Sequence, residues 1–312
     1  MRKTLTFAAL TLSISPLALA HGPAQFAQSA QQEVVITSED LGNGVHMLRG
    51  QGGNIGLLVG EDGVFVIDSQ FARIAPKNLA KINEIAGAAP KFLVNTHWHG
   101  DHTGGNGNFG ATIVAHENTR KRLTTEYTLN RAGNESVSKP TDPSLWPVIT
   151  FDERLKLHLN GQTISVFHTP DAHTDTDAMV YFEEANVLHM GDVFFKGNFP
   201  FVDVGSGGTI AGYIAAMKTA YDLCDENTKV IPGHGALASR EDIAASIGML
   251  EGVQGAIAKA IEDGMSLEDA TKANILADWS EQWGSGGINP SIMLALAWQD
   301  MTSAKALSPK GS

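Results

Sequence analysis

The stretch that decides the fold is His97-Trp98-His99-Gly100-Asp101-His102, in which four of six side chains can bind a metal ion. It follows an apolar run that is predicted to be a β-strand. Side chains alternate along an extended backbone, so His97 and His99 should point the same way. We expect Gly100 to let the chain turn, so that Asp101 and His102 face a neighbouring point. The stretch therefore predicts two adjacent metal positions, one served by two imidazoles and one by a carboxylate and an imidazole.

The ligand chemistry favours a catalytic site over a structural one. Nitrogen and oxygen ligands with an open coordination position are typical of catalytic zinc, whereas structural zinc sites are closed and rich in cysteine. The chain has one cysteine, Cys224, which excludes a thiolate site. Cys224 lies at the end of a predicted helix, where we expect a buried, unreactive thiol. The alternative for the cluster itself is a histidine-rich surface turn with no function.

Four further motifs along the chain each carry an aspartate or a histidine. Taken singly, each has an ordinary explanation, such as a loop histidine, a turn histidine or a helix N-cap. Together and in this order they resemble the five motifs of the metallo-β-lactamase superfamily, over about Val34 to Ser246. The four are Asp68 after the strand Val64–Ile67, His173, the Gly-Asp pair that ends at Asp192, and Ile231-Pro232-Gly233-His234-Gly235.

The resemblance implies a set of seven metal ligands for two Zn²⁺ ions. It places His97, His99 and His173 on the first ion, and Asp101, His102 and His234 on the second. It also implies that Asp192 bridges the two ions and that Asp68 orients the loop without touching a metal.

Strands come in runs with helices after each run, which predicts an α+β fold. We expect an αββα sandwich, two mixed β-sheets packed face to face with helices on the outer faces, as one domain over residues 33–308. A helix is predicted from His116 to about Leu129. The polar stretch from Asn130 to Trp146 reads as a loop or as part of a lid. The predicted strands are 33–36, 44–48, 55–59, 64–67, 91–95, 111–115, 155–159, 163–167, 179–182, 187–189 and 229–231, and the other predicted helices are 71–85, 210–224, 240–263 and 290–307.

The ligand set implies hydrolysis by a metal-bound hydroxide. Asp101 and His234 are the residues assigned to catalysis, and an amide or ester bond of a β-lactam- or lactone-like substrate is the expected target. Two other classes stay open. One is a mononuclear iron oxidoreductase similar to sulfur dioxygenases, and the other is an exported metal-binding accessory protein without turnover.

Two departures from the β-lactamase pattern concern the substrate. Some of those enzymes carry a long apolar flap just before the third strand. The corresponding segment here, Arg49–Asn54, is short and glycine-rich. Some of them also use a cysteine at the position of Asp192, with a lysine three residues later. Here Phe195 occupies that place and Lys196 is one step further. Possible substrate-binding residues are therefore Lys196, as a carboxylate-binding group, with Trp98 and Phe199 as apolar walls.

The first residues predict export. Arg2 and Lys3 precede an apolar run from Leu5 to Leu19 that ends in a small-x-small site, which is typical of a signal peptide over residues 1–20. A flexible leader is expected over residues 21–32. Cleavage would change the net charge from −12 to −14. Such an acidic chain is a poor partner for nucleic acid. We therefore expect a periplasmic or secreted protein with a small-molecule substrate and no membrane span after cleavage, and the oligomeric state stays open.

Overall fold

Two β-sheets lie against each other in the computed structural model, which describes residues 33–307. The predicted signal peptide and leader, over residues 1–32, lie outside the described residues, as do residues 308–312. The first sheet contains, in spatial order, β1 (Thr37–Gly42), β2 (Val45–Arg49), β3 (Ile55–Leu58), β4 (Val64–Ile67), β5 (Pro90–Val94), β6 (Thr112–His116) and β9 (Ile149–Phe151). Every residue of β4 is buried, as its unbroken apolar run predicts. This sheet is mixed, because β4 runs antiparallel to β3 and parallel to β5.

The second sheet carries two of the predicted ligands on adjacent strands. It contains, in spatial order, β10 (Arg154–Leu159), β11 (Gln162–His168), β12 (Ala178–Phe182), β13 (Val187–Phe195) and β14 (Lys229–His234). Its strands are antiparallel from β10 to β13, and β13 and β14 are parallel. Asp192 lies in β13 and His234 ends β14, so the parallel pairing brings the two side chains to one end of the sheet.

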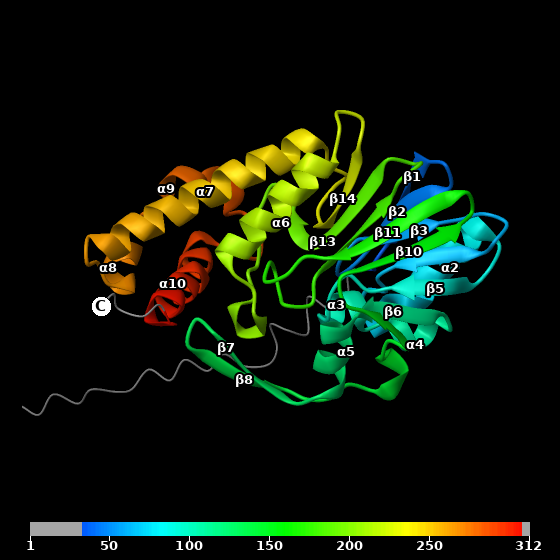
Figure 1. Ribbon diagram of the computed structural model, residues 1–312, viewed down its shortest axis with the longest axis horizontal. Helices are drawn as coiled ribbons and strands as arrows, with labels where there is room; N and C mark the ends of the chain where they lie inside the picture. The colour runs from blue at the N-terminus through cyan, green and yellow to red at the C-terminus, as the bar shows by residue number, and fades with distance from the viewer. Residues whose placement is uncertain (1–32, 308–312) are drawn as a thin grey trace, which may run out of the picture. The chain divides into compact units, whose positions relative to one another are not determined.

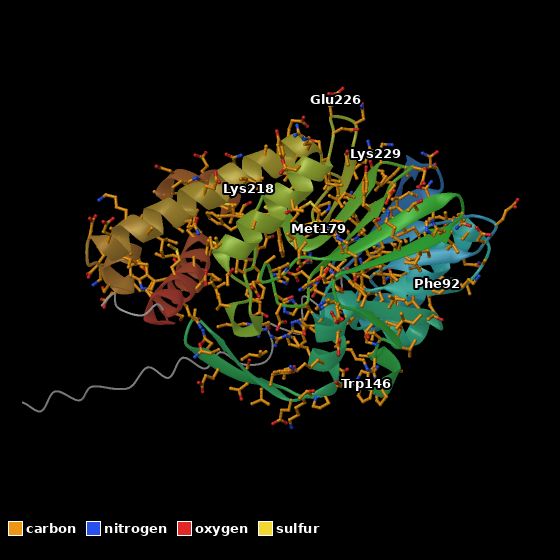
Figure 2. The ribbon with its side chains drawn as sticks, viewed as in Figure 1. Phe92, Trp146, Met179, Lys218, Glu226 and Lys229 are labelled. Carbon is orange, nitrogen blue, oxygen red and sulfur yellow. The ribbon has the colours of Figure 1, made fainter. Side chains whose placement is uncertain are left out.

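An apolar layer fills the space between the sheets. The rings of Phe65 and Phe182 meet edge to face there, with centroids 6.0 Å apart, and Val94, Val166 and Ile231 belong to the same buried cluster. Figure 1 shows β1, β2, β3 and β5 of the first sheet, in blue and cyan, against β10, β11 and β13 of the second, in green. Met179 of β12 lies in the interior of the molecule, whereas Glu226 lies at its edge (Figure 2).

Helices cover the outer faces of both sheets, which confirms the predicted αββα arrangement. On the second sheet, Tyr213 and Met217 of α6 pack in one buried cluster with Leu188 of β13. Leu250 of α7 and Met293 of α10 belong to the same cluster. On the first sheet, α4 contacts β5 and α5 contacts β6. The helices are α2 (Ala75–Ala86), α3 (Gly100–Thr103), α4 (Asn106–Phe109), α5 (Glu117–Thr124), α6 (Ile210–Leu223), α7 (Arg240–Glu262), α8 (Leu267–Lys272), α9 (Ala277–Trp283) and α10 (Pro290–Leu307), with 3-10 turns η2 (Ala72–Ile74), η3 (Pro143–Leu145) and η4 (Val204–Ser206).

The segment after α5 differs from the prediction. The helix expected to reach Leu129 ends at Thr124, and the next residues form a hairpin of β7 (Tyr127–Arg131) and β8 (Asn134–Ser138). Ala132 and Gly133 join the two strands with positive φ angles of 52° and 82°, a turn that a helix cannot continue through. Half of the stretch predicted as a loop or lid is thus regular structure. Other differences are smaller. The strand predicted over residues 33–36 does not form, and β1 begins only at Thr37. Strands β13 and β14 continue past the predicted ranges 187–189 and 229–231, and β9, α3, α4, α8 and α9 were not predicted.

Two further expectations concern single features. Cys224 is buried, and burial raises the pKa of its thiol to about 11, so it is the inert core residue that the sequence predicts. Among residues 33–307, no helix combines the length and the hydropathy that a membrane span requires.

Candidate metal centre

The HWHGDH stretch leaves β5 and turns into α3. The turn is made by the start of the helix, because the amides of His102 and Thr103 both donate to the carbonyl of His99 over 3.0 Å. The expected role of Gly100 is not required, since a Cβ atom there would meet nothing within 4 Å. Glycine is required instead at Gly53, where a Cβ would lie 2.0 Å from Cε1 of His102. The glycine-rich segment before β3 therefore packs directly against the ligand cluster.

Three histidines from two distant segments form a first cluster with Asp192. Nδ1 of His99 lies 2.9 Å from Nε2 of His173. Oδ2 of Asp192 lies 3.8 Å from Nε2 of His97 and 3.6 Å from Nε2 of His173. These four ligand atoms lie within 4.8 Å of one another, although His173 follows His99 by 74 residues.

The other three predicted ligands form a second cluster beside the first. Nε2 of His234 lies 3.3 Å from Oδ2 of Asp101 and 3.4 Å from Nε2 of His102. The second carboxylate oxygen of Asp192, Oδ1, lies 3.0 Å from Nε2 of His102 and 3.3 Å from that of His234. Asp192 thus presents one oxygen to each cluster, and all seven predicted ligands meet.

These donor atoms fit metal ions. Ligands of one tetrahedral zinc at 2.0–2.1 Å lie about 3.4 Å from each other, which is close to the spacing of both clusters. Nε2 of His97 is buried with no hydrogen-bond partner, a costly state that binding to a metal ion would relieve. Burial, followed by the charge of His102, lowers the pKa of His97 well below its usual value. Its ring is therefore neutral, which is the form that binds metals.

The second cluster is electrostatically suited to cations. Burial lowers the pKa of His234, but Asp192 and Asp101 outweigh burial and raise it to about 9. Burial raises the pKa of Asp101, yet the neighbouring His102 and His234 bring it to about 2. Carboxylates at this spacing therefore attract positive charge, whether protons or a metal ion supply it.

Asp68 belongs to neither cluster and lies behind the second one. Its Oδ2 accepts from Nδ1 of His102 over 2.7 Å, and its two oxygens also accept from the amide and the hydroxyl of Thr96 over 2.8 and 2.7 Å. The carboxylate is fully buried. It therefore orients His102 with Nε2 toward the cluster.

Two residues behind the first cluster, Asp203 and Arg131, were missed. Oδ2 of Asp203 lies 2.8 Å from Nε2 of His99, and the carbonyl of Phe201 accepts from Nδ1 of His173 over 2.5 Å. Arg131 in turn binds both oxygens of Asp203. Neither Asp203 nor Arg131 lies in a recognisable motif, and the sequence carries no signal that would join residues 72 positions apart.

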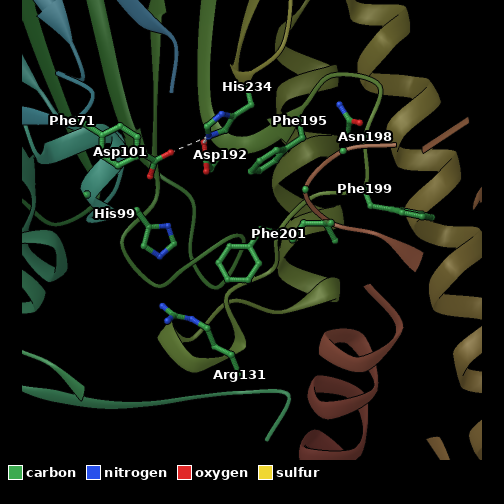
Figure 3. Close-up of a pocket in the computed structure, with 14 residues that line it drawn as sticks. Phe71, His99, Asp101, Arg131, Asp192, Phe195, Asn198, Phe199, Phe201 and His234 are labelled. Atoms are coloured by element: carbon green, nitrogen blue, oxygen red, sulfur yellow. Dashed lines mark ion pairs between the residues drawn. The ribbon is translucent and has the colours of Figure 1, made fainter. Parts of the chain in front are cut away.

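A pocket of about 660 Å³ opens over the clusters and has a largely aromatic wall (Figure 3). Phe195 stacks on His234, and Phe201 lies beside His99 and His173. Of the proposed wall residues, Phe199 does line this pocket, although it is almost fully buried. The lining residues are Phe71, His99, Gly100, Asp101, Arg131, Asp192, Phe195, Asn198, Phe199, Phe201, His234, Gly286, Gly287 and Ile288.

Lys196 and Trp98 do not line the pocket. The ammonium group of Lys196 donates to the carbonyl of Leu237 over 2.8 Å and pairs with Asp242 over 2.9 Å. Its positive charge is thus paired near the start of α7, and the ammonium group is not placed to bind a substrate carboxylate in the pocket. Trp98 is buried, with the guanidinium of Arg122 5.6 Å from its ring. It packs behind the cluster as a structural residue.

Comparison with known proteins identifies relatives of this arrangement. The family model of the metallo-beta-lactamase superfamily matches residues 48–234. The human acyl-coenzyme A thioesterase MBLAC2 is 24% identical over 225 residues, which cover 63% of this chain and 80% of that protein. A beta-lactamase-like protein 2 homolog of Caenorhabditis elegans is 26% identical over 151 residues, 48% of this chain and 44% of that protein. This chain therefore spans less than half of the worm protein.

Solved structures show the same fold at low identity. A metallo-beta-lactamase from Pontibacter korlensis superposes with a TM-score of 0.56 at 18% identity, over 69% of this chain and 99% of that one. A variant of the sec-alkyl sulfatase PisA1 superposes with a TM-score of 0.67 at 14% identity, over 88% of this chain and 52% of that one. At these identities the likeness concerns the fold alone.

Proposed function

This chain belongs to the metallo-β-lactamase superfamily, and on that premise we propose that it is an exported dinuclear zinc hydrolase. Its substrate is a small molecule with an amide or ester bond, such as a β-lactam or a lactone. The seven ligands of the proposed centre are those predicted above, with His97, His99 and His173 at one ion and Asp101, His102 and His234 at the other.

The observation that carries this proposal is the position of Asp192. Each oxygen of its carboxylate faces a different cluster, at 3.0 Å from His102 on one side and 3.6 Å from His173 on the other. A carboxylate placed in this way serves two ions better than one. A site for a single ion would leave the second cluster, with Asp101 and His234, without an ion to bind.

Bound zinc ions would lower the pKa of a coordinated water and polarise the carbonyl of the bond to be cleaved. The chain supplies the surroundings of that chemistry. Asp101 and His234 both line the pocket, so the second cluster faces the substrate. The carboxylate of Asp101 can accept the proton of the attacking water. The aromatic wall of Phe195 and Phe201 excludes bulk water and receives an apolar part of the substrate.

The relatives support an acyl bond as the target. The human relative is named as a thioesterase, and a thioester differs from an ester by one sulfur atom at the reacting carbonyl. An iron oxidoreductase with one metal is the second candidate, since histidine and carboxylate ligands also suit iron. The complete second cluster favours the two-zinc hydrolase over it, and also over an accessory protein without turnover.

Metal analysis joined to a substrate panel tests the proposal. The purified chain should hold two zinc ions and hydrolyse at least one of nitrocefin, a lactone or a thioester, with loss of activity on chelation. Hydrolysis of a phosphodiester alone would contradict the acyl bond as the target. Asp192→Asn should lose metal and turnover, whereas His158→Gln, at an exposed position of β10, should change neither. One iron per chain with oxygen consumption would support the oxidoreductase instead. Bound zinc without any turnover would support the accessory protein.

Export is a separate part of the proposal. It is supported by Arg2, Lys3 and the apolar run to Leu19. Fractionation of cells that express the full chain should place it in the periplasm or the medium, and N-terminal sequencing should begin at His21. A cytoplasmic protein that keeps residues 1–20 would contradict export and leave the proposed chemistry untouched.

A further inference from the structure

A buried carboxylate outside the ligand set holds the first cluster from behind. Asp203 follows the aromatic wall and is fully buried. Its Oδ2 lies 2.8 Å from Nε2 of His99 and accepts from the hydroxyl of Ser206 over 2.6 Å. Its backbone amide donates to the carbonyl of His173 over 2.9 Å. One residue therefore contacts both histidines that face each other across the first cluster.

The contact with Asp203 decides which nitrogen of His99 faces the cluster. A carboxylate only accepts hydrogen bonds, so Nε2 of His99 must carry a proton and donate it. In the neutral ring, Nδ1 is then left with a lone pair. That atom lies 2.9 Å from Nε2 of His173, inside the first cluster. Without the carboxylate, the ring is free to place its proton on either nitrogen and to rotate.

Arg131 holds the carboxylate in place. Its Nε and Nη2 atoms donate to the two oxygens of Asp203, over 2.6 and 2.5 Å. Burial raises the pKa of Asp203, but the hydrogen bonds from Arg131, His99 and Ser206 outweigh it and keep the pKa far below its usual value. The planar guanidinium matches a carboxylate in both orientation and charge, which a lysine cannot do.

The position of Arg131 depends on the C-terminal helix. Arg131 ends β7, and Gln299 of α10 bonds the hairpin on both sides of it: the side-chain carbonyl accepts from the amide of Ala132, and the side-chain amide donates to the carbonyl of Asn130 over 3.2 Å. Gly205 of η4 packs against the backbone of Asn130. Helix α10 lies outside the family match over residues 48–234.

From these contacts we propose that Arg131 and Asp203 are positioning residues that orient His99 for metal binding, and that Gln299 holds Arg131 for this task. The proposal rests on the proposed two-metal function. It adds that the hairpin and the C-terminal helix are required for a tight first metal site, although neither supplies a ligand.

The first test measures metal affinity in the full chain by competition with a chromophoric chelator. In Asp203→Asn and Arg131→Met, one of two zinc equivalents should bind about 10- to 100-fold more weakly, and the other should keep its affinity. Gln299→Ala should have a smaller effect on the same equivalent. Arg131→Lys should resemble Arg131→Met, because one ammonium cannot replace two guanidinium bonds.

The matched control is Arg154→Met. Arg154 also lies near a phenylalanine ring, at 6.0 Å from Phe167, as Arg131 does at 5.8 Å from Phe201, but it is exposed and on β10. Its substitution should leave both affinities unchanged. Circular dichroism and the melting temperature report whether each variant folds. A variant that weakens both zinc equivalents equally has a general structural defect and contradicts the positioning role.

The second test reads the His99 ring directly and does not require metal. In protein labelled with ¹⁵N-histidine, two-dimensional NMR should show His99 with its proton on Nε2 in the wild type and a mixture of ring forms in Asp203→Asn. Unchanged affinities and an unchanged ring form in the variants would overturn this inference alone. A wild type that binds no zinc would instead overturn the proposed function, and the ring form would still decide the role of Asp203.

Discussion

The ring of Phe195 lies almost parallel to the imidazole of His234, with centroids 4.9 Å apart and 16° between the planes. Phe195 thereby fixes the one ligand that is about one-third exposed and gives the pocket an apolar wall next to it. This stacking joins the apolar wall of the pocket to the second cluster.

Phe195→Ala should therefore impair both ligand placement and substrate packing. Loss of an aromatic contact of about 1.5 kcal/mol corresponds to roughly a tenfold lower kcat/KM for an apolar ester. Steady-state kinetics on the metal-loaded protein measures this. Val148→Ala, at an exposed position outside the pocket lining, serves as the control and should keep the wild-type value. A Phe195→Ala enzyme with wild-type kinetics on apolar esters would show that the ring does not contact substrate.

Lys196→Met should affect folding stability and leave substrate recognition unchanged. The ammonium group is bound by Asp242 and the carbonyl of Leu237, and both ionic side chains are about one-third exposed, so the pair contributes only about 0.5 kcal/mol to the free energy of unfolding. Urea unfolding should detect this small loss. KM for a carboxylate-bearing β-lactam should stay within twofold of wild type. A tenfold rise in that KM would show that Lys196 binds the substrate carboxylate, as expected from the sequence.

Asp68 should respond differently to asparagine and to alanine. Its backbone is left-handed, with φ at 63°, a conformation that aspartate and asparagine tolerate better than alanine does. Asp68→Asn should keep the fold while weakening the orientation of His102 and lowering turnover. Asp68→Ala should also lose about 2–4 kcal/mol of unfolding free energy, because it leaves Thr96 and His102 without their acceptor. Equal stability of the two variants in urea would contradict this explanation.

His116 should make the protein less stable in acid. Burial and the stacked ring of His168, 3.7 Å away, lower its pKa to about 4. Between pH 6.5 and 4 the unfolded chain therefore binds a proton that the folded chain rejects, so stability falls as the pH falls through this window. The expected loss is on the order of 2 kcal/mol. His116→Asn keeps an acceptor for the amide of Asn118 and should reduce the pH dependence of unfolding, and a slope identical to wild type would exclude a contribution from His116.

The charge of the pocket predicts that substrates with several negative charges are hydrolysed less efficiently than neutral ones. Arg131 is the only lysine or arginine among the pocket-lining residues that the structure describes, and Asp203 already neutralises it. The whole chain also has a net charge of −12. With the same acyl group, a neutral thioester should be hydrolysed with at least tenfold higher kcat/KM than a coenzyme A thioester, and added salt should narrow the difference. A preference for the coenzyme A thioester at low salt would contradict it.

The sequence alone determined the features that depend on local pattern. The unbroken run Val64–Ile67 predicts a buried central strand because alternation is absent, and β4 is that strand. The HWHGDH stretch holds four ligands within six residues, so their proximity follows from chain connectivity. The resemblance to the five superfamily motifs then pointed to His173, Asp192 and His234, and the fold brings all three to the cluster.

Only the tertiary structure decided what surrounds the ligands. Lys196 is the first residue after β13, which ends at Phe195. The ring of Phe195 stacks on His234, whereas the chain turns at Lys196, whose ammonium group pairs with Asp242 of α7. The bond between Arg131 and Asp203 joins a hairpin to a 3-10 turn 72 residues away, with α10 holding the hairpin. Such pairings arise from packing between distant elements, and packing leaves no periodicity or spacing in the sequence from which they could be predicted.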